Sequence, residues 1–471
     1  MKYLSYFFVL FLFYSCYYQN NNSEINTPII KRDSSYHYFL NKYSFPKITH
    51  NKSSNISRFN HLLHSSTLEN PSRIKVQFYG QSIIEGLNYK NIINELNLLF
   101  PSVIFEIKFN PIGGFTAPNL KRTAPHDLYY EYADLVVFHA YTENKTEDLD
   151  TLFYQLKTNS TSEVLVLNHH YAYFQNPEKA QQRTEQDNIQ SNQIKGLVNK
   201  YNYELLDIRK YWKTFIELND SLTVKSLIKD HLHPNEKGNS FIEYCIVEKL
   251  KQKVNYNSKN SGITIQKTEK VLTNNHEFVY NFKGNRIDIN IESISDSSEL
   301  LFFIDEMLPS QHKNAYLIQR PSSCFEFYWP GIRRVTYNSE ILPIEELWEV
   351  KLFNFNRNTK SFDFSLYGTK TGQDGHGNSH ENFISNSKRI KFEKEDFMIF
   401  KSESVSGKKT PENFKFYFIV KPLFYDSYKL KGKNEIRIIQ GINNSTHSLT
   451  IKVKKGKVNL HSIKVYNPSI Y

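Results

Sequence analysis

The chain is poor in cysteine. Its 471 residues contain three, Cys16, Cys245 and Cys324, and these are widely spaced. Three dispersed thiols cannot build a disulfide framework or the four-ligand set of a structural zinc site. Cys245 lies in an apolar helical pattern and Cys324 in a β-rich stretch, so both are expected to be buried and unreactive. The sequence therefore argues against a domain held together by disulfides or zinc.

The chain also lacks a block of basic residues, although its formal net charge is +11. Its lysines are scattered, and Asn, Lys, Ile, Tyr and Phe are abundant throughout, as an AT-rich coding bias produces. A protein that binds nucleic acid gathers Lys and Arg on one face or in one stretch to neutralise phosphates. The charge pattern therefore argues against a nucleic-acid partner.

The apolar run at the N-terminus is too short for an ordinary transmembrane helix. Leu4–Tyr14 follows the basic start Met1-Lys2 and has the length of a signal-peptide core, whereas a spanning helix needs about 20 apolar residues. Ser15-Cys16 ends the run and resembles a bacterial lipoprotein signal, with Cys16 as the lipidated residue. We therefore expect residues 1–16 to be a signal peptide and the protein to be exported, as a cell-surface or periplasmic lipoprotein or in secreted form. A lipid on Cys16 would be its membrane link.

Two changes in composition and in the pattern of apolar residues divide the rest of the chain. Residues 17–70 are rich in Asn, Ser, Lys and Tyr without sustained periodicity, which predicts that most of this segment is a tether, with room for short structure near Tyr36–Phe45. From 71 to 255, strand and helix patterns alternate, which predicts a parallel α/β sheet. The predicted strands are Ile74–Tyr79, Val103–Phe109, Asp134–Phe138, Glu163–Leu167 and Leu205–Ile208, and the predicted helices are 83–100, 177–201 and 235–254.

Beyond a polar linker at 255–262, the apolar pattern becomes two-fold. Ile287–Ile291, Leu449–Val453 and Ile463–Val465 alternate apolar and polar residues, and helix-length patterns are scarce. Half-buried antiparallel strands have this period. The pattern predicts an all-β sandwich over residues 263–471.

Two distant motifs complement each other chemically. Gly80-Gln81-Ser82 follows the first predicted strand, and Asp230 precedes His233 by three residues in a turn-like block. A serine hydroxyl is a poor nucleophile until an imidazole removes its proton, and a carboxylate fixes the tautomer of that imidazole. Both motifs are expected at the carboxyl edge of the sheet, where the sites of open α/β folds collect. The pattern therefore predicts an acyl-transfer hydrolase, although a serine after a strand is also a common helix N-cap.

These motifs resemble those of the SGNH (GDSL-like) hydrolases over residues 71–255. Asp230-His231-Leu232-His233-Pro234-Asn235 matches the closing block of that family, and Gly80-Gln81-Ser82 stands where Gly-Asp-Ser is usual, as in some carbohydrate O-acetylesterases. The resemblance implies esterases and deacetylases on a flavodoxin-like three-layer α/β fold. It implies Ser82 as nucleophile, His233 as base and Asp230 as its partner, with no metal or cofactor. The tail resembles the β-rich region found after this domain in some bacterial GDSL-like proteins.

The resemblance also implies an oxyanion hole. The Ser82 N–H is one donor, and a glycine N–H after the second strand, from Gly113 or Gly114, would be the next. Each preorganised donor of this kind contributes roughly a hundred- to a thousand-fold in rate. Glycine in that loop also permits positive φ, so a plain turn is the alternative for this pair.

The third family donor is an Asn within Gly-x-Asn-Asp, and this chain departs from that pattern. Glu143 occupies the expected position, and a carboxylate cannot donate unless it is protonated. Either Asn144, one residue on, shifts in, or His139 substitutes, or the third donor is absent. His169 and His170 follow the fourth predicted strand. They could line the pocket, but we predict that they are solvated loop residues.

The substrate is predicted to be an O-acetyl group on a glycan, from the resemblance, the export signal and the appended β region. Trp329 and Trp348 could stack on sugar rings, although as strand residues they are expected in a core. A lipase or general esterase would use the same residues with an apolar cleft. A non-catalytic glycan-binding protein on a decayed hydrolase fold is the alternative of a different class.

Overall fold

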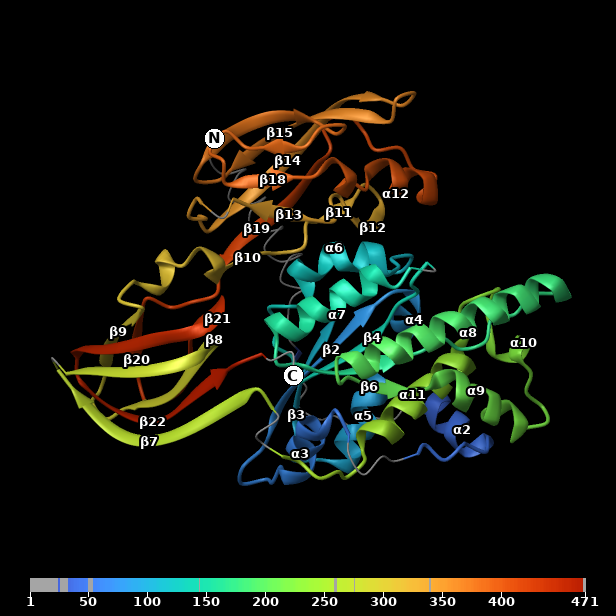
Figure 1. Ribbon diagram of the computed structural model, residues 1–471, viewed down its shortest axis with the longest axis horizontal. Coiled ribbons are helices and arrows are strands. Elements are labelled where there is room, and N and C mark those ends of the chain that lie inside the picture. The colour runs from blue at the N-terminus through green and yellow to red at the C-terminus, as the bar shows by residue number, and fades with distance from the viewer. Residues whose placement is uncertain are drawn as a thin grey trace.

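A parallel sheet forms the centre of the N-terminal half in the computed structural model of the protein (Figure 1). The structure describes residues 24–25, 33–49, 54–143, 145–257, 261–274, 276–338 and 340–468. The six-stranded sheet has the order β1-β3-β2-β4-β5-β6, with β1 antiparallel at one edge and the other strands parallel. Its strands are β1 (Glu24–Ile25), β2 (Arg73–Gly80), β3 (Ile104–Phe109), β4 (Leu135–His139), β5 (Glu163–Leu167) and β6 (Glu204–Leu206).

Helices cover both faces of this sheet, which gives three layers (Figure 1). Along β4 every residue is buried, as expected for a central parallel strand covered on both faces. One face packs against α6 (Ala117–Asp127), α7 (Glu147–Asn159) and α8 (Pro177–Lys200). The other packs against α3 (Ser57–Ser65), α5 (Tyr89–Leu99), α9 (Ile208–Glu217) and α11 (Glu236–Leu250). Counted along the chain, the parallel strands lie in the order 2-1-3-4-5, so the order reverses beside β2, where sites of such sheets form.

The predicted tether over 17–70 is wrong for its described part, apart from the short structure expected near Tyr36–Phe45, where helix α2 (Ser34–Lys42) lies. Helix α2 and helix α3 bury Phe39 and Phe59 in the core of the α/β body. The Glu163 carboxylate at the start of β5 accepts hydrogen bonds from the main-chain N–H groups of Arg58 and Phe59 at 2.9 and 2.7 Å. This segment is therefore part of the domain. The predicted signal peptide and Cys16 lie outside the described residues.

Residues 263–471 differ from the predicted single sandwich, because their described part forms two β bodies with separate cores. The first, at the left of Figure 1, is a six-stranded antiparallel sheet in the order β20-β9-β21-β8-β22-β7. Its strands come from both ends of the region: β7 (Ile263–Thr273), β8 (Glu277–Ser293), β9 (Ser298–Ile304), β20 (Ser427–Leu430), β21 (Lys433–Lys455) and β22 (Lys457–Tyr466).

The second β body is inserted between β9 and β20, and we call it the inserted β body (residues 316–422). A five-stranded sheet, β10-β19-β14-β15-β16, packs against a three-stranded sheet, β13-β18-β17, through aromatic contacts such as Phe392 against Phe418. A hairpin of β11 and β12 and the helix α12 complete it. The bounds are β10 (Tyr316–Ile318), β11 (Ser323–Cys324), β12 (Phe327–Pro330), β13 (Val335–Tyr337), β14 (Glu346–Asn356), β15 (Ser361–Gly368), β16 (Gly372–Asn378), β17 (Phe383–Ile384), β18 (Ile390–Phe392), α12 (Ile399–Ser406) and β19 (Lys415–Pro422).

The inserted β body is anchored on helix α6 of the α/β body (Figure 1). Arg122 of α6 donates from Nε to the buried Asp396 carboxylate at 2.8 Å. His126 Nδ1 lies 2.7 Å from the Ile318 carbonyl oxygen, and Arg320 pairs with Asp127 at 2.8 Å. Apolar residues of both bodies belong to one continuous core. These contacts fix the position of the inserted β body above the sheet.

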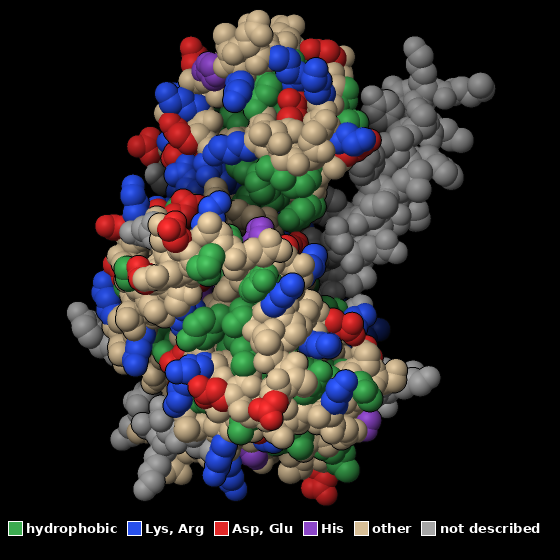
Figure 2. All heavy atoms as spheres, turned by 90° about the vertical axis from the view of Figure 1, so that its right-hand side faces the viewer, with side chains coloured by type: hydrophobic (Ala, Val, Ile, Leu, Met, Phe, Trp, Pro, Cys, Tyr) green, Lys and Arg blue, Asp and Glu red, His purple; other side chains and the backbone are tan. Residues whose placement is uncertain are grey.

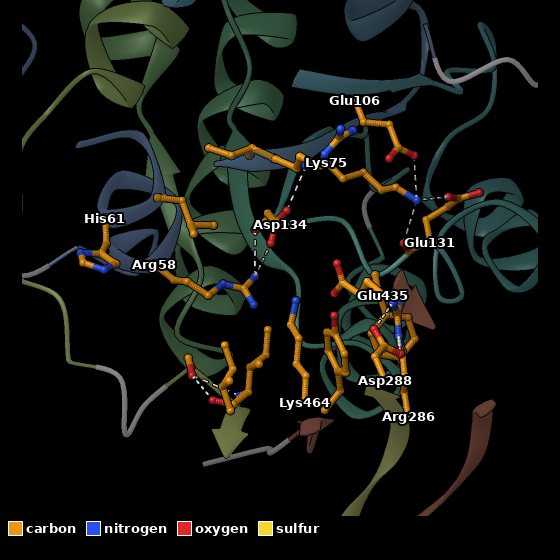
Figure 3. A pocket seen from close by; sticks show the side chains of 18 of the residues that line it. Arg58, His61, Lys75, Glu106, Glu131, Asp134, Arg286, Asp288, Glu435 and Lys464 are labelled. Carbon is orange, nitrogen blue, oxygen red and sulfur yellow. Dashed lines mark hydrogen bonds and ion pairs between the residues drawn. The ribbon is translucent and has the colours of Figure 1, made fainter. Parts of the chain in front are cut away.

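The six-stranded antiparallel sheet meets the α/β body near the amino ends of the parallel strands, around a charged pocket of about 920 Å³ (Figure 3). Ion pairs line it: Lys75 with Glu131 at 3.2 Å and Arg286 with Asp288 at 2.6 Å. Each of these pairs lies within one body, and the bodies are joined by hydrogen bonds such as that from the Asn285 side chain of β8 to the Asn159 carbonyl oxygen at 3.1 Å.

Two further sequence expectations concern the described residues. Cys245 and Cys324 are both buried and unpaired, as predicted. Among the helices that the structure describes, none is both long and apolar enough to cross a membrane.

Candidate active site

Ser82 lies at the carboxyl end of β2, as the first residue of the short helix α4 (Ser82–Glu85). The strand reaches this point through Gly80, whose φ is +151° and whose absent Cβ would lie 2.3 Å from the His139 carbonyl oxygen. Only glycine allows β2 to approach β4 this closely. The helix N-cap is Gln81 and not Ser82, because the Gln81 side chain accepts the capping hydrogen bond.

His233 and Asp230 lie in the loop between α10 (Val224–Leu227) and α11. The Asp230 Oδ1 accepts from the main-chain N–H groups of Leu232 and His233 at 2.7 and 2.9 Å, which folds the loop into a turn. Asn235 caps α11 by accepting from the Gly238 N–H at 3.1 Å, as the sequence predicted. The turn thus places the carboxylate and the imidazole on the same side.

The structure brings three predicted residues into one hydrogen-bonded line. The Ser82 Oγ lies 3.0 Å from His233 Nε2, and His233 Nδ1 lies 2.8 Å from Asp230 Oδ2. Although partial burial acts to raise it, hydrogen bonds from the His233 and Leu232 N–H groups and from the imidazole hold the pKa of the Asp230 carboxyl well below its usual value. The carboxylate therefore stays ionised and can keep a proton on Nδ1, which leaves Nε2 free to accept from the serine.

The loop that carries this line is held in place by His170. Its Nε2 lies 2.7 Å from the Leu232 carbonyl oxygen, between Asp230 and His233. Burial lowers the pKa of His170 to about 4, so it is neutral and Nε2 donates. The prediction that His169 and His170 are solvated is therefore wrong, because both side chains are buried.

The two predicted main-chain oxyanion donors lie at the pocket, but each already has a hydrogen-bond acceptor. Gly113 and Gly114 lie in the loop after β3 and line the same pocket as Ser82. The Gly113 N–H donates to the Glu85 carboxylate, and this hydrogen bond opposes the burial that raises the pKa of Glu85. The Ser82 N–H donates to Gln81 Oε1 at 3.1 Å. Both main-chain donors therefore face an acceptor of the chain itself.

Among the described residues, neither Glu143, at the position of the third family donor, nor His139 supplies that donor. Asn144 lies outside the described residues. Glu143 accepts a hydrogen bond from the Thr116 hydroxyl at the rim. His139 is fully buried, with its two ring nitrogens against Gln81 and His169, so it cannot substitute for the missing Asn.

The pocket around Ser82 has a volume of about 850 Å³ and is lined by two bodies of the protein. The α/β body contributes Ser82 and His233, and the inserted β body contributes Tyr328 and Trp329 of β12 and Val405 of α12. Figure 2 faces this side and shows hydrophobic side chains gathered at the lower edge of the upper body.

The hairpin of β11 and β12 is fixed to the glycine loop. The Tyr328 hydroxyl and the Trp329 Nε1 both donate to the Gly113 carbonyl oxygen, at 3.1 and 2.8 Å. Tyr328 remains 50% exposed, so part of its ring is open to a ligand. Trp348 is buried in the core, as predicted, and cannot stack on a sugar.

No protein-family model matches the chain, and no curated protein matches it. Among solved structures, similarity is found to Axe2, an acetylxylan esterase from Geobacillus stearothermophilus (17% identity over 39% of this chain and 97% of that one, TM-score 0.32). The acetyl xylan esterase AlAXEase is similar at 21% identity over 37% and 98% of the two chains, with a TM-score of 0.32.

A two-domain esterase active on acetylated mannans, CEX, co-crystallised with mannopentaose, is similar over 85% of this chain and 92% of its own, at 12% identity and a TM-score of 0.31. The structural neighbours are thus acetyl esterases of xylan or mannan.

Proposed function

We propose that the protein is a serine esterase of the SGNH type that removes O-acetyl groups from a carbohydrate. The observation that carries the proposal is the hydrogen-bonded line from Ser82 through His233 to Asp230, at 3.0 and 2.8 Å. An ordinary serine on a helix does not face an imidazole whose other nitrogen is held by a carboxylate.

In the proposed reaction, the Ser82 Oγ attacks the acetyl carbonyl carbon while its proton passes to His233 Nε2. The tetrahedral intermediate collapses, and the sugar hydroxyl leaves with the proton that His233 returns. A water molecule then attacks the acetyl-serine, again with His233 as base, and acetate is released. Asp230 stabilises the imidazolium throughout, and no metal or cofactor is needed.

The oxyanion of the intermediate would lie against the N–H groups of Ser82 and of Gly113 or Gly114, with Asn144 as the third candidate. Gln81 and Glu85 accept from two of these groups in the free protein, so substrate must compete with them. This favours, as a second candidate, glycan binding without turnover.

We propose a sugar as the leaving group because the site is open to a bulky hydrophilic substrate. The side chains of Asp230 and His233 are partly exposed, at 46% and 40% of their surfaces. Aromatic rings with polar tips, such as Tyr328, bind sugars through one face. A lipase would instead need a deep apolar cleft around Ser82. We further propose that the protein is exported and that Cys16 carries a lipid.

Acetate release from a short chromogenic acetyl ester and from acetylated oligosaccharides tests this function. Wild type should turn over both, and Ser82→Ala should reduce the rate by roughly 10⁴-fold or more. Preference for long-chain esters would point to a lipase. Binding of the oligosaccharide without turnover, and equally well by Ser82→Ala, would support the second candidate.

A further inference from the structure

We propose that His139, His169 and Gln190 are positioning residues that act on the nucleophile through Gln81. They lie behind the pocket, at the ends of β4 and β5 and in the middle of α8, and together with Gln81 we call them the relay. Their proposed task is to keep the carboxamide oxygen of Gln81, and not its nitrogen, against Ser82. This inference rests on the proposed function.

The relay is a continuous hydrogen-bonded chain. Gln81 Nε2 lies 3.1 Å from His139 Nδ1, and His139 Nε2 lies 3.0 Å from His169 Nδ1. His169 Nε2 lies 3.2 Å from Gln190 Oε1, which also accepts from the Thr142 main-chain N–H at 3.2 Å. Four polar side chains thus connect the nucleophile to the main chain after β4.

One end of the relay has a fixed polarity. A main-chain N–H can only donate, so the group of Gln190 that faces Thr142 must be the carboxamide oxygen. The same oxygen faces His169 Nε2, and an acceptor there requires a proton on Nε2. A neutral imidazole with a proton on Nε2 accepts at Nδ1. The Thr142 N–H therefore selects the tautomer of His169.

The tautomer of His169 in turn fixes the tautomer of His139 and the orientation of the Gln81 carboxamide. Because His169 Nδ1 accepts, His139 Nε2 must carry a proton and donate to it. His139 Nδ1 then accepts, and the group of Gln81 that faces it must be the NH₂. The Gln81 oxygen is left pointing toward Ser82.

The other end of the relay requires the same polarity independently. Gln81 Oε1 accepts from the Ser82 main-chain N–H at 3.1 Å and lies 2.8 Å from the Ser82 Oγ. A flipped carboxamide would set its NH₂ against the Ser82 N–H, donor against donor. Main-chain donors at both ends therefore agree on one arrangement of all the protons, and a single reversed group would break the pattern.

The surroundings keep the two imidazoles neutral, as this arrangement needs. His139 and His169 are completely buried. Burial lowers the pKa of His139 to about 3 and holds the pKa of His169 well below its usual value. The Tyr141 ring packs on His169 with centroids 4.1 Å apart, and the Arg183 cation lies over that ring, which disfavours a second cation.

The consequence lies at the nucleophile. With an acceptor 2.8 Å from its Oγ, the Ser82 hydroxyl is held in the rotamer that also brings Oγ within 3.0 Å of His233 Nε2. Rotation about the Cβ–Oγ bond turns the Ser82 hydroxyl hydrogen from the Gln81 oxygen to His233 Nε2. A nitrogen in place of the oxygen would donate to Oγ and remove this arrangement.

The test is the rate at which a fluorophosphonate inactivates wild type and relay variants, because this reagent needs the nucleophile but not the glycan. His139→Leu removes the acceptor for Gln81 and should slow inactivation roughly ten- to a hundred-fold, the scale on which small misplacements of reacting groups act. His139→Asn places an oxygen where Nδ1 stood and should restore most of the rate. Asn60→Leu, which removes a buried carboxamide bound to the Leu250 carbonyl oxygen outside the pocket, controls for general destabilisation.

Equal rates for wild type and His139→Leu, or equal losses in the Leu and Asn variants, would overturn the relay while leaving the proposed function intact. A wild type that does not react would overturn both. If His139→Leu does not fold, the tautomers decide: nitrogen NMR of histidine-labelled wild type should show His139 and His169 neutral with the proton on Nε2. A proton on Nδ1 of either ring would contradict the relay.

Discussion

At the scale of single residues, Asp230 does two tasks with its two oxygens. Oδ1 folds the turn through two N–H groups, and Oδ2 meets His233 Nδ1. Asp230→Asn keeps an oxygen for the turn but sets an NH₂ against Nδ1, which favours the wrong tautomer of His233. We expect kcat/KM to fall by roughly 10²- to 10⁴-fold with little change in the melting temperature. Asp220→Asn, at an exposed position, is the matched control.

Gly80 is the residue that brings Ser82 to its place. An alanine there would put its Cβ 2.3 Å from the His139 carbonyl oxygen, so β2 and β4 would have to separate. We expect Gly80→Ala to lower the free energy of unfolding by about 2 kcal/mol or more and to reduce activity as well.

Gly196, inside α8, offers the opposite case for the same substitution. It has open space around its Cβ position and no positive φ. Gly196→Ala should raise stability by about 0.5–1 kcal/mol, since alanine loses less backbone entropy in a helix. Chemical denaturation of both variants checks the pair, and equal effects would contradict the close approach of β2 to β4.

At the scale of elements, the sequence predicted the parallel sheet well. The predicted strand Glu163–Leu167 agrees with β5, and the predicted starts and ends of the other strands lie close to those of β2, β3 and β4. Strong apolar runs bounded by turns carry this information. Ile208 was predicted to end a strand but begins α9, because only Asp207 separates β6 from this helix.

Elements whose burial depends on distant partners could not be predicted. Helices α2 and α3 are short and polar, and they are buried only because β5 and α11 offer them partners such as Glu163.

His139 and His169 are polar residues at strand ends, where solvent exposure is the usual outcome. The sequence does place both histidines at the carboxyl edge of the sheet, where Ser82 also lies, and this was the one sign of a role at the site. The hydrogen bonds that make their burial favourable form only in the folded protein.

Helix α3 gives a pH prediction at this scale. Burial raises the pKa of Glu163 to about 7 in the folded protein, above the unfolded value of about 4.3. The folded state therefore binds this proton more tightly, and its stability should fall as the pH rises from about 4.3 through 7. Glu163→Gln should remove this part of the slope. Urea midpoints at pH 5 and pH 8 measure it, and an unchanged slope in the variant would contradict the assignment.

At the scale of the whole molecule, the pocket belongs to two bodies. The inserted β body contributes Tyr328 to the pocket that Ser82 lines, and it is itself anchored on α6 by Arg122 and Asp396. The sequence predicted a β region after the α/β domain. It could not predict that this region forms two β bodies, because the strands of the first come from both ends of the region, nor that the inserted β body lines the site.

Because the inserted β body lines the pocket but supplies no triad residue, substitutions in it should change substrate binding and leave the chemical step intact. Tyr328→Ala removes a ring that is open to a ligand and should raise KM for an acetylated oligosaccharide roughly ten-fold, with little effect on a small acetyl ester. Tyr328→Phe keeps the ring and loses the bond to Gly113, so it should stay near wild type for binding. Steady-state kinetics with the two substrates decides; equal effects of Tyr328→Ala on both would contradict a sugar subsite on the inserted β body.

The most direct test of the central claim, that His233 activates Ser82, is to locate the adduct of a fluorophosphonate by peptide mass spectrometry. The adduct should lie on Ser82 in wild type, and its formation should be slowed by at least about a thousand-fold in His233→Ala. Labelling of another residue, or labelling of Ser82 at the same rate without His233, would contradict the account.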